Sequence, residues 1–575
     1  MRKFFDWIDE LGGADCEKKS AMWLERIAFV FLILMVLSAP HSIAATQTAW
    51  LLGTAAWLVR LFIKPRPKIV RTPLDIALWL FFGWTVVTSV FSYAPGISID
   101  KLRGALIFLV FYFVVNNLRN IRAAKFLAFT LVFSCMASAL WSPIERIYGR
   151  GVEMYGVGAE SLFSKAVHFD HDAYLKAKGK NLPENLGAEN EPKPLGDGDT
   201  IVEANGRKIR TPEDLVDEIK KSNLTYLECF NPPEYFTRIV KRENLLDGAN
   251  SLEKFGITNW KHSRNWRYGG FYGHIITYAE VLQMITSLVL GLFIANFGRE
   301  EEEETTRNGD EESPDERKSA RSFFRLPPRL FASFPFLIFC LPAMIFALLT
   351  TYTRSAQIGF LVSAIVMILV YGNRKMLLIS AIIILPLAVA GAFLLQQNRN
   401  PGFEKKDESL IYRQTVYREG FNLWTHDARK FLFGIGMDST KRFAEEWHLY
   451  DDGRLPVGHF HSTPLQLLVE RGLPALLLWF WILWIYARTL LLNLRLQIED
   501  SSLAVSNQKS KIKNQKSDSW QRRGILLGCV GGLAGFCVSS SVNYSLGDGE
   551  VAMVFFILMG IGISLVIQNS KSDAL

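Results

Sequence analysis

Long apolar segments recur along the whole chain and dominate its pattern. Each is long enough to cross a hydrocarbon core of roughly 30 Å as a helix, and polar or charged residues separate one segment from the next. The pattern predicts an all-α polytopic membrane protein with twelve transmembrane spans. The expected spans are residues 27–45, 46–63, 74–92, 102–117, 125–143, 273–297, 330–350, 356–372, 376–395, 464–486, 524–543 and 550–567.

Basic residues indicate which side of the membrane each connecting segment occupies. Lysine and arginine concentrate on the cytoplasmic side of membrane proteins, so both termini are expected in the cytoplasm, and the two long polar segments are expected outside it, in the periplasm. The predicted domains are N-terminal membrane helices at 1–143, a periplasmic loop at 144–272, membrane helices at 273–395, a periplasmic catalytic loop at 396–463 and C-terminal membrane helices at 464–575.

Composition narrows the chemistry. The chain has 575 residues, 49% of them hydrophobic, and a net charge of +8 that lies largely in short loops. That charge reports membrane orientation, so no nucleic-acid partner is expected. The six cysteines include no CxxC pair, and five lie in predicted membrane or cytoplasmic segments. Neither a disulfide framework nor a metal site is therefore expected.

The first periplasmic loop contains the pattern of a small α+β module. Within residues 194–219, a Gly-Asp turn precedes an alternating strand, an Asn-Gly turn leads to a second strand, and Thr-Pro-Glu-Asp opens a helix. Residues 224–241 alternate like a closing hairpin. This stretch resembles the second half of a bacterial PDZ domain and implies a PDZ-like module at about 151–245.

A PDZ-like module implies a peptide or protein partner, because PDZ domains capture an extended peptide beside an edge strand and hold its terminal carboxylate with backbone amides. The carboxylate-binding loop is matched only weakly, at Tyr155-Gly156-Val157-Gly158. A structural or docking module is the alternative.

Three arginines lie at predicted outer edges of the membrane. Arg354 lies in the short turn between the seventh and eighth spans, and Arg413 and Arg418 lie ahead of a Gly-x-Gly sequence. A guanidinium group binds phosphate with bidentate geometry and keeps its proton. Each arginine is therefore a candidate phosphate ligand, with anchoring at the membrane interface as the alternative.

Two histidines, His459 and His461, precede a Thr-Pro helix start. Thr463 is the expected N-cap, so the tenth span is predicted to begin just past His461. The positive end of a helix favours a neutral imidazole that can accept a proton. A role at the membrane interface without chemistry is the alternative.

The order and spacing of these stretches resemble the O-antigen ligase and polymerase superfamily. The resemblance covers about residues 330–490 strongly. It rests on the turn Thr350–Arg354, an arginine ahead of Gly434-Ile435-Gly436, and a His-Ser helix start followed by Glu470-Arg471-Gly472-Leu473-Pro474. One departure is Ser462, where asparagine is more usual.

The resemblance implies a GT-C-like, metal-independent, inverting glycosyltransferase of the bacterial inner membrane that needs no cofactor. Its partners would be a polyprenyl diphosphate-linked glycan donor, a glycolipid or glycan acceptor, and membrane lipids. Arg354 and Arg413 would hold the diphosphate, assisted by Arg418. His461 would activate or orient the acceptor hydroxyl, and His459 would contribute to substrate binding.

Two further places are candidates. Glu470 and Arg471 lie inside the tenth span, where ionisable residues are costly and often functional; a structural pair that braces the Gly472 break is the alternative. Arg267 and His274 lie among aromatic residues ahead of the sixth span, as a sugar or lipid site would require. An aromatic belt at the interface is the alternative there.

Three rival functions can be weighed. A polysaccharide polymerase of the same superfamily differs only in its acceptor, so the motifs do not separate it from a ligase. A lipid-linked sugar transporter commonly has internal repeats, and no convincing repeat relates the two halves. An intramembrane protease is excluded most firmly, because the chain contains neither His-Glu-x-x-His nor Gly-x-Ser-x-Gly.

Overall fold

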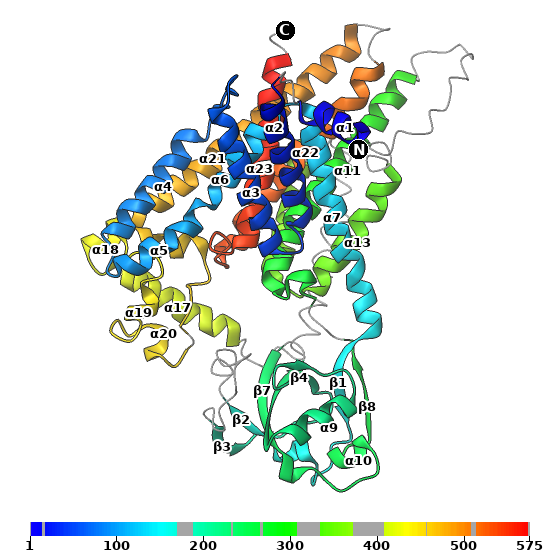
Figure 1. The fold of residues 1–575 in the computed structure, drawn as a ribbon, viewed down its shortest axis with the longest axis vertical. Helices are drawn as coiled ribbons and strands as arrows, with labels where there is room; N and C mark the ends of the chain where they lie inside the picture. The colour runs from blue at the N-terminus through cyan, green and yellow to red at the C-terminus, as the bar shows by residue number, and fades with distance from the viewer. Residues whose placement is uncertain are drawn as a thin grey trace. The chain divides into compact units, whose positions relative to one another are not determined.

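The computed structural model describes residues 2–13, 18–169, 188–231, 234–264, 268–307, 334–371, 408–455, 457–507 and 513–572. The chain divides into two compact units (Figure 1). The helical unit comprises Met1–Leu140, Gly269–Phe393 and Lys405–Leu575, and the other unit, which contains the strands, comprises Trp141–Tyr268 and Leu394–Glu404.

The helical unit is built from helices of very different lengths. Its described helices are α1 (Arg2–Gly12), α2 (Lys19–Ser38), α3 (Ile43–Phe62), α4 (Asp75–Val90), α5 (Pro95–Ala105), α6 (Leu109–Asn117), α7 (Ile121–Tyr148), α11 (Ile275–Arg307), α13 (Phe334–Thr350), α14 (Arg354–Tyr371), α17 (Glu408–Thr425), α18 (Ala428–Phe433), α19 (Thr440–Phe443), α20 (Leu449–Asp452), α21 (Thr463–Asn507), α22 (Lys513–Ser541) and α23 (Gly549–Ser572). α7 continues past Leu140 into the other unit.

Seven described helices are long and apolar enough to cross a membrane: α2, α7, α11, α14, α21, α22 and α23. Two shorter helices, α4 and α13, are also apolar. The protein is therefore a polytopic membrane protein. The predicted ninth span at 376–395 lies outside the described residues, and twelve crossings remain a prediction.

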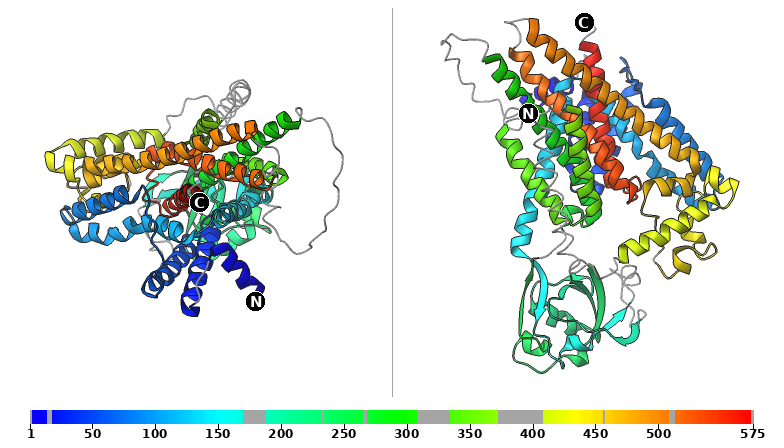
Figure 2. Two further views of the ribbon diagram at one scale, coloured as in Figure 1. Left: turned by 90° about the horizontal axis from the view of Figure 1, so that it is seen from above. Right: turned by 180° about the vertical axis from the view of Figure 1, so that it is seen from behind.

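The centre of the helical unit is a close pack of α11, α22 and α23, which run side by side (Figures 1 and 2). α23 is buried along nearly its whole length from Val551 to Leu565, as expected for a helix that is apolar on every side. Glycines allow α11 and α22 to approach closely. A Cβ on Gly291 would lie 2.3 Å from the backbone nitrogen of Gly528, which leaves no room for a side chain.

The first helix and the last helix end on the same side of the helical unit. α1 and the C-terminal end of α23 lie towards the same end in Figure 1 and in the right-hand view of Figure 2. This arrangement agrees with an even number of crossings between them. Which side of the membrane this end faces remains a prediction from the basic residues.

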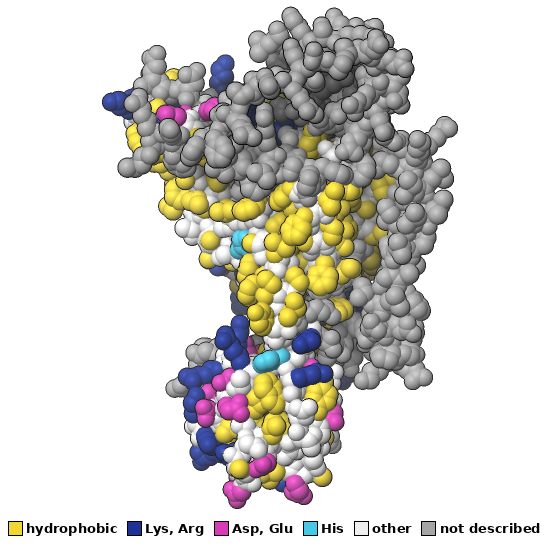
Figure 3. All heavy atoms as spheres, turned by 90° about the vertical axis from the view of Figure 1, so that its right-hand side faces the viewer, with side chains coloured by type: hydrophobic (Ala, Val, Ile, Leu, Met, Phe, Trp, Pro, Cys, Tyr) yellow, Lys and Arg dark blue, Asp and Glu magenta, His cyan; other side chains and the backbone are white. Residues whose placement is uncertain are grey.

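Among the residues that the structure describes, the second unit is an eight-stranded sheet with two short α-helices. Its strands are β1 (Arg150–Tyr155), β2 (Val167–Phe169), β3 (Ala188–Pro192), β4 (Thr200–Ala204), β5 (Arg207–Lys208), β6 (Leu224–Asn231), β7 (Glu234–Lys241) and β8 (Asn259–Ser263). The order is β3-β2-β7-β6-β4-β1-β8, with β5 paired to β4. The helices α9 (Pro212–Lys221) and α10 (Ser251–Phe255) complete it. On the face in Figure 3, charged side chains gather on this unit and hydrophobic ones over the helical unit.

The local elements predicted within this unit are confirmed. Asn205 and Gly206 both have positive φ, 49° and 79°, and they connect the antiparallel strands β4 and β5. Thr211 caps α9 in a capping box with Asp214, and Pro212 is the first helical residue. β6 and β7 form the closing hairpin. The PDZ resemblance itself remains a prediction, and β8, which pairs with β1, lies beyond the stretch that suggested it.

The weak candidate for a carboxylate-binding loop already contains a carboxylate from the same unit. Val157 N–H donates to Asp197 Oδ1 at 2.9 Å. Backbone hydrogen bonds from Val157 and Gly156 lower the pKa of Asp197. A peptide carboxylate would have to displace Asp197 to use these amides, which favours the structural alternative for the module.

Candidate active site

Four segments of the helical unit meet at one asparagine in the loop between α22 and α23. Asn543 Nδ2 donates to Glu280 Oε1 of α11 at 2.6 Å and to Ser355 Oγ of α14 at 2.9 Å. The Asn543 carbonyl accepts from both the backbone N–H and the hydroxyl of Thr463, each at 3.0 Å. Asn543 therefore joins the predicted arginine turn to the start of the helix that follows the two histidines.

Arg354 is the first residue of α14 and is exposed. The turn before it is tight: Tyr352 has a left-handed φ of 50°, and Thr351 Oγ1 accepts from Thr353 N–H at 3.2 Å. The next residue, Ser355, is held by Asn543. A guanidinium group beside the positive end of a helix suits an anionic ligand.

His459 and His461 lie together just ahead of α21. Their ring centroids are 4.2 Å apart, and His461 N–H donates to His459 Nδ1 at 3.3 Å. His461 has a left-handed φ of 45°. The Tyr417 hydroxyl donates to the His461 carbonyl at 2.7 Å, and the Tyr412 ring lies edge-on at 5.4 Å from the imidazole. Such unusual backbone concentrates at functional sites.

The helix after these histidines, α21, begins one residue earlier than predicted. α21 starts at Thr463, so the prediction of Thr463 as the N-cap is wrong. Ser462 precedes the helix, and its Oγ accepts from Leu465 N–H at 3.4 Å. The Thr463 hydroxyl is engaged by the Asn543 carbonyl instead.

Burial and nearby positive charge keep His461 neutral. Burial contributes most, and His459 and Arg413 add to it, lowering the pKa of His461 to about 4. Burial also lowers the pKa of His459, with Lys441 acting in the same direction and Asp548 opposing it. An imidazole with so low a pKa is free to accept a hydrogen bond near pH 7, but it abstracts a proton with little driving force. Orienting an acceptor hydroxyl therefore suits His461 at least as well as deprotonating it.

α17 contributes the next predicted arginines, but on different sides of the helix. Arg413 is half-buried and close enough to His461 to lower its pKa. Arg418 is exposed. Five residues of α-helix turn through about 140° beyond one full rotation, so Arg418 does not share the Arg413 face. Tyr417, one turn after Arg413, does share it and contacts His461.

His274 reaches the same region through Asp548. His274 Nδ1 lies 2.7 Å from Thr277 Oγ1, which donates to Asp548 Oδ2 at 2.5 Å. His274 and Asp548 both influence the pKa of His459. His274 therefore lies near the histidine pair, as the prediction requires, whereas Arg267 lies outside the described residues. In the part of the chain that is described, no three His, Cys, Asp or Glu side chains are grouped so that they could hold a metal ion.

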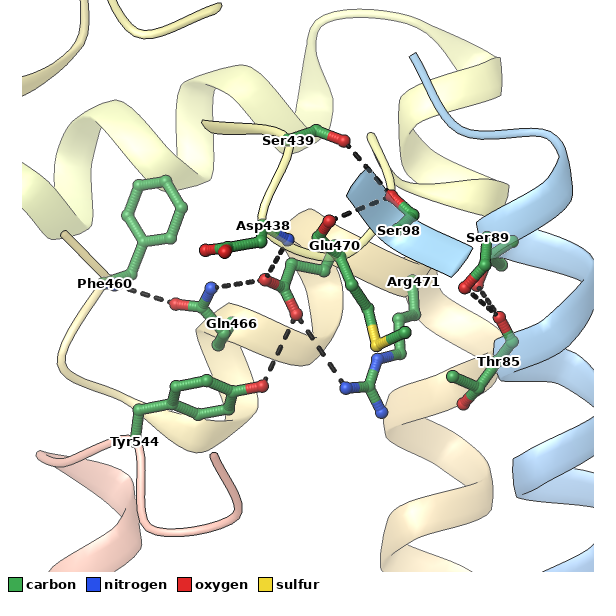
Figure 4. A network of polar contacts seen from close by, with 12 residues as sticks. Thr85, Ser89, Ser98, Asp438, Ser439, Phe460, Gln466, Glu470, Arg471 and Tyr544 are labelled. Atoms are coloured by element: carbon green, nitrogen blue, oxygen red, sulfur yellow. Dashed lines mark hydrogen bonds and ion pairs between the residues drawn. The ribbon is translucent and has the colours of Figure 1, made fainter. Parts of the chain in front are cut away.

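The Glu470 carboxylate is enclosed by donors from three segments (Figure 4). Its Oε1 accepts from Asp438 N–H at 2.9 Å and from Gln466 Nε2 at 2.8 Å. Its Oε2 lies 3.5 Å from the Tyr544 hydroxyl and 3.9 Å from an Arg471 nitrogen. Glu470 is only 3% exposed. These contacts support the structural alternative for the Glu470–Arg471 pair.

A loop from the predicted outer segment fills the break in α21. The break occurs at Gly472, whose φ is 73°, and Pro474 has no N–H to offer the Glu470 carbonyl. Gly436 N–H supplies the missing donor at 2.8 Å, and Ile435 N–H pairs at 2.8 Å with the carbonyl before it. The Gly-x-Gly motif is therefore a backbone brace for the broken helix.

The sequence reading missed several of these residues. Glu280 offered a signal, because it is a carboxylate within an apolar span. Asn543 and Asp548 lie in the short loop between α22 and α23, which the motifs do not reach, and no motif singles out Tyr412 or Tyr417.

Comparison with known proteins adds one match. Residues 339–480 match the O-antigen ligase family. The matched stretch includes Arg354, Arg413, His459, His461 and Glu470. No curated protein matches the chain. The chain is therefore a multi-pass membrane protein whose residues 339–480 match the model of the O-antigen ligase family.

Proposed function

We propose that the protein is an O-antigen ligase-type glycosyltransferase of the bacterial inner membrane. It moves a glycan from a polyprenyl diphosphate carrier to an acceptor hydroxyl at the periplasmic face. The observation that carries the proposal is the convergence around Asn543, which links the Arg354 turn to the start of the helix after His461. The family match covers both Arg354 and His461.

The reaction is a single displacement. The acceptor oxygen attacks the anomeric carbon while the bond from that carbon to the diphosphate oxygen breaks. The diphosphate leaves with the electron pair, and the proton of the acceptor hydroxyl passes to His461 Nε2 or Nδ1, or from there to the departing diphosphate. The configuration at the sugar carbon is inverted. Arg354 and Arg413 bind the diphosphate and stabilise the charge that develops on it. Arg418, on another side of α17, meets a more distant part of the donor.

His461 receives the acceptor. Its neutral imidazole accepts a hydrogen bond from the hydroxyl and aligns the oxygen with the anomeric carbon. A bound diphosphate adds negative charge nearby, which raises the pKa of His461 and strengthens it as a base in the ternary complex. His459, in ring contact with His461, and His274 bind the sugar or acceptor beside it.

The experiment is transfer by the full-length protein in cells that lack the gene. His461→Ala, Arg354→Ala and Arg413→Ala are each expected to abolish long surface glycan and to enrich the carrier-linked pool. The controls are His426→Ala and Arg454→Ala, which remove exposed residues of the same types from the matched stretch. The proposal fails if all three variants reach the membrane and transfer glycan like the wild type.

The carrier-linked pool also separates the two members of the superfamily. Long chains that accumulate on the carrier in His461→Ala indicate a ligase, because polymerisation has already happened. Single repeat units on the carrier indicate a polymerase and would replace the ligase proposal. Carrier-linked glycan trapped on the cytoplasmic side would indicate a transporter.

A further inference from the structure

A cavity lies in the helical unit, and none of the residues of the candidate active site lines it. The Tyr272 hydroxyl, close to His274, donates to the Ala39 carbonyl just before α3. The cavity lies at the other end of α3, which is 20 residues and about 30 Å long. Its volume is about 350 Å³. The residues that matter below are Glu25, Arg60, Arg66, Lys68, Arg119 and Ser564.

The cavity is strongly cationic. Four cationic side chains and one carboxylate line it, which leaves a net charge of +3. Glu25 is engaged by two of the cations: Arg60 Nε donates to its Oε1 at 2.8 Å and Arg119 to its Oε2 at 2.6 Å. Arg66 and Lys68 are exposed and have no ion-pair partner within the described ranges.

The cavity wall is also fixed in place. Arg60 is 4% exposed and donates to the carbonyls of Ile63 and Pro65 at 2.7 Å, besides its bond to Glu25. Ser564, on α23, is 2% exposed, yet its hydroxyl has no partner among the residues that the structure describes. A buried polar group without a partner calls for an unseen ligand or water. Arginine and hydroxyl groups held in fixed positions along a cavity wall are suited to binding a phosphate.

We propose that this cavity binds the phosphate of an anionic phospholipid headgroup. The four cations supply the charge, and the volume is sufficient for a headgroup. Large apolar side chains flank the basic segment: Phe62 is 79% exposed and Ile69 is 61% exposed. Such residues suit contact with acyl chains, which a free phosphate lacks. Basic pockets between membrane helices bind anionic headgroups in this way.

The test measures lipid binding to the purified full-length protein by native mass spectrometry. Phosphatidylglycerol is titrated against phosphatidylcholine. Arg66→Gln with Lys68→Gln is the informative variant, because it removes two cavity cations and leaves the Glu25 ion pairs intact. Lys64→Gln with Arg71→Gln is the matched control: it removes two exposed charges from the same segment that do not line the cavity.

The wild type and the control are expected to retain one tightly bound phosphatidylglycerol. The cavity variant is expected to bind it about thirty-fold more weakly. Ser564→Ala, with every charge kept, is expected to weaken it as well. The proposal is overturned if both double variants lose affinity equally, because the effect would then be general surface charge.

Competition with inorganic phosphate distinguishes a lipid headgroup from a free phosphate, which would both present a phosphate group to the cavity. For a lipid site, 10 mM inorganic phosphate (roughly ten thousand times a micromolar Kd) should leave phosphatidylglycerol bound. If inorganic phosphate alone raises the melting temperature of the wild type but not of the cavity variant, and phosphatidylglycerol binds no better than phosphatidylcholine, the occupant is a free phosphate. The lipid proposal is then wrong. Glycan transfer by both double variants serves as the check on folding.

Discussion

Asn543→Ala separates the arginine turn from the rest of the candidate active site. The substitution removes the Nδ2 donor that binds Glu280 and Ser355 but keeps the backbone carbonyl that binds Thr463. The start of α21 therefore stays anchored, while the turn that carries Arg354 loses its tether. The variant tests whether this tether is needed for transfer.

The loss of folding stability caused by Asn543→Ala can be estimated from the hydrogen bonds that it removes. Losing the hydrogen bond to Ser355 costs about 1 kcal/mol. Glu280 is 2% exposed, and removing the donor that binds its buried Oε1 costs a further 1–3 kcal/mol, roughly 2–4 kcal/mol together. If the turn relaxes by about 1 Å, misalignment of the reacting groups lowers transfer on the order of 100-fold.

The assay is transfer in proteoliposomes, with the thermal midpoint measured in the same preparation. Gln283→Ala is the matched control, because Gln283 is a buried amide of α11 that likewise donates two side-chain hydrogen bonds, in its case to the hydroxyls of Ser287 and Ser363. Both variants are expected to lose similar stability, and only Asn543→Ala is expected to lose transfer. Equal transfer by the two variants would refute the reasoning, because Asn543 would then be an ordinary buried amide.

Three other perturbations follow from the geometry. Arg413→Gln removes a charge that lowers the pKa of His461, which is about 4 in the wild type. The imidazole of His461, titrated by NMR without substrate, should therefore protonate at higher pH in the variant, and an unmoved titration would contradict the assignment. Gly434→Ala places a Cβ 2.4 Å from the backbone of α21, whereas the control Gly453→Ala has open space at a similar φ. The fall in thermal midpoint should therefore correspond to a stability loss of about 3–5 kcal/mol for Gly434→Ala and about 1–2 kcal/mol for Gly453→Ala. Equal falls would contradict the close packing of this loop against the break in α21. Thr211→Ala removes the capping box of α9 at a cost of about 1 kcal/mol, seen as faster hydrogen exchange in that helix; unchanged exchange would contradict it.

Local patterns in the sequence carried much of the fold. A long apolar run must be a helix if it is to satisfy its backbone in lipid, and within the described residues apolar helices lie at nine of the twelve predicted spans. The prediction of one helix over 102–117 is wrong, because α5 and α6 are separated there by a 3-10 turn at Leu106–Phe108. The Asn205-Gly206 turn and the Thr211 cap could also be predicted from the sequence, because each depends only on neighbours a few residues away. The order of the sheet was not legible, since β8 pairs with β1 across more than a hundred residues.

The same distinction applies to the candidate site. Arginine and histidine residues at membrane edges can be recognised in the sequence, because charged groups there are costly and serve only a few functions. The residues that hold these side chains in position cannot be recognised in the same way. Asn543 and Ser355 are 188 residues apart in the chain, and each is an unremarkable polar residue near a helix end. Only the packing of α11, α14 and α22 makes them partners.

The first two turns of α21 are fixed at both ends by two consecutive residues of one loop. Asn543 binds Thr463 at the start of the helix, and the Tyr544 hydroxyl lies 3.5 Å from Glu470, seven residues later. Two helical turns span about 10.5 Å, so the loop between α22 and α23 matches the helix at two points. A break at Gly472 would ordinarily let this short piece move. Because the loop and the Gly436 brace both hold it, His461 is presented from a rigid element, and rigidity is what an aligned displacement requires.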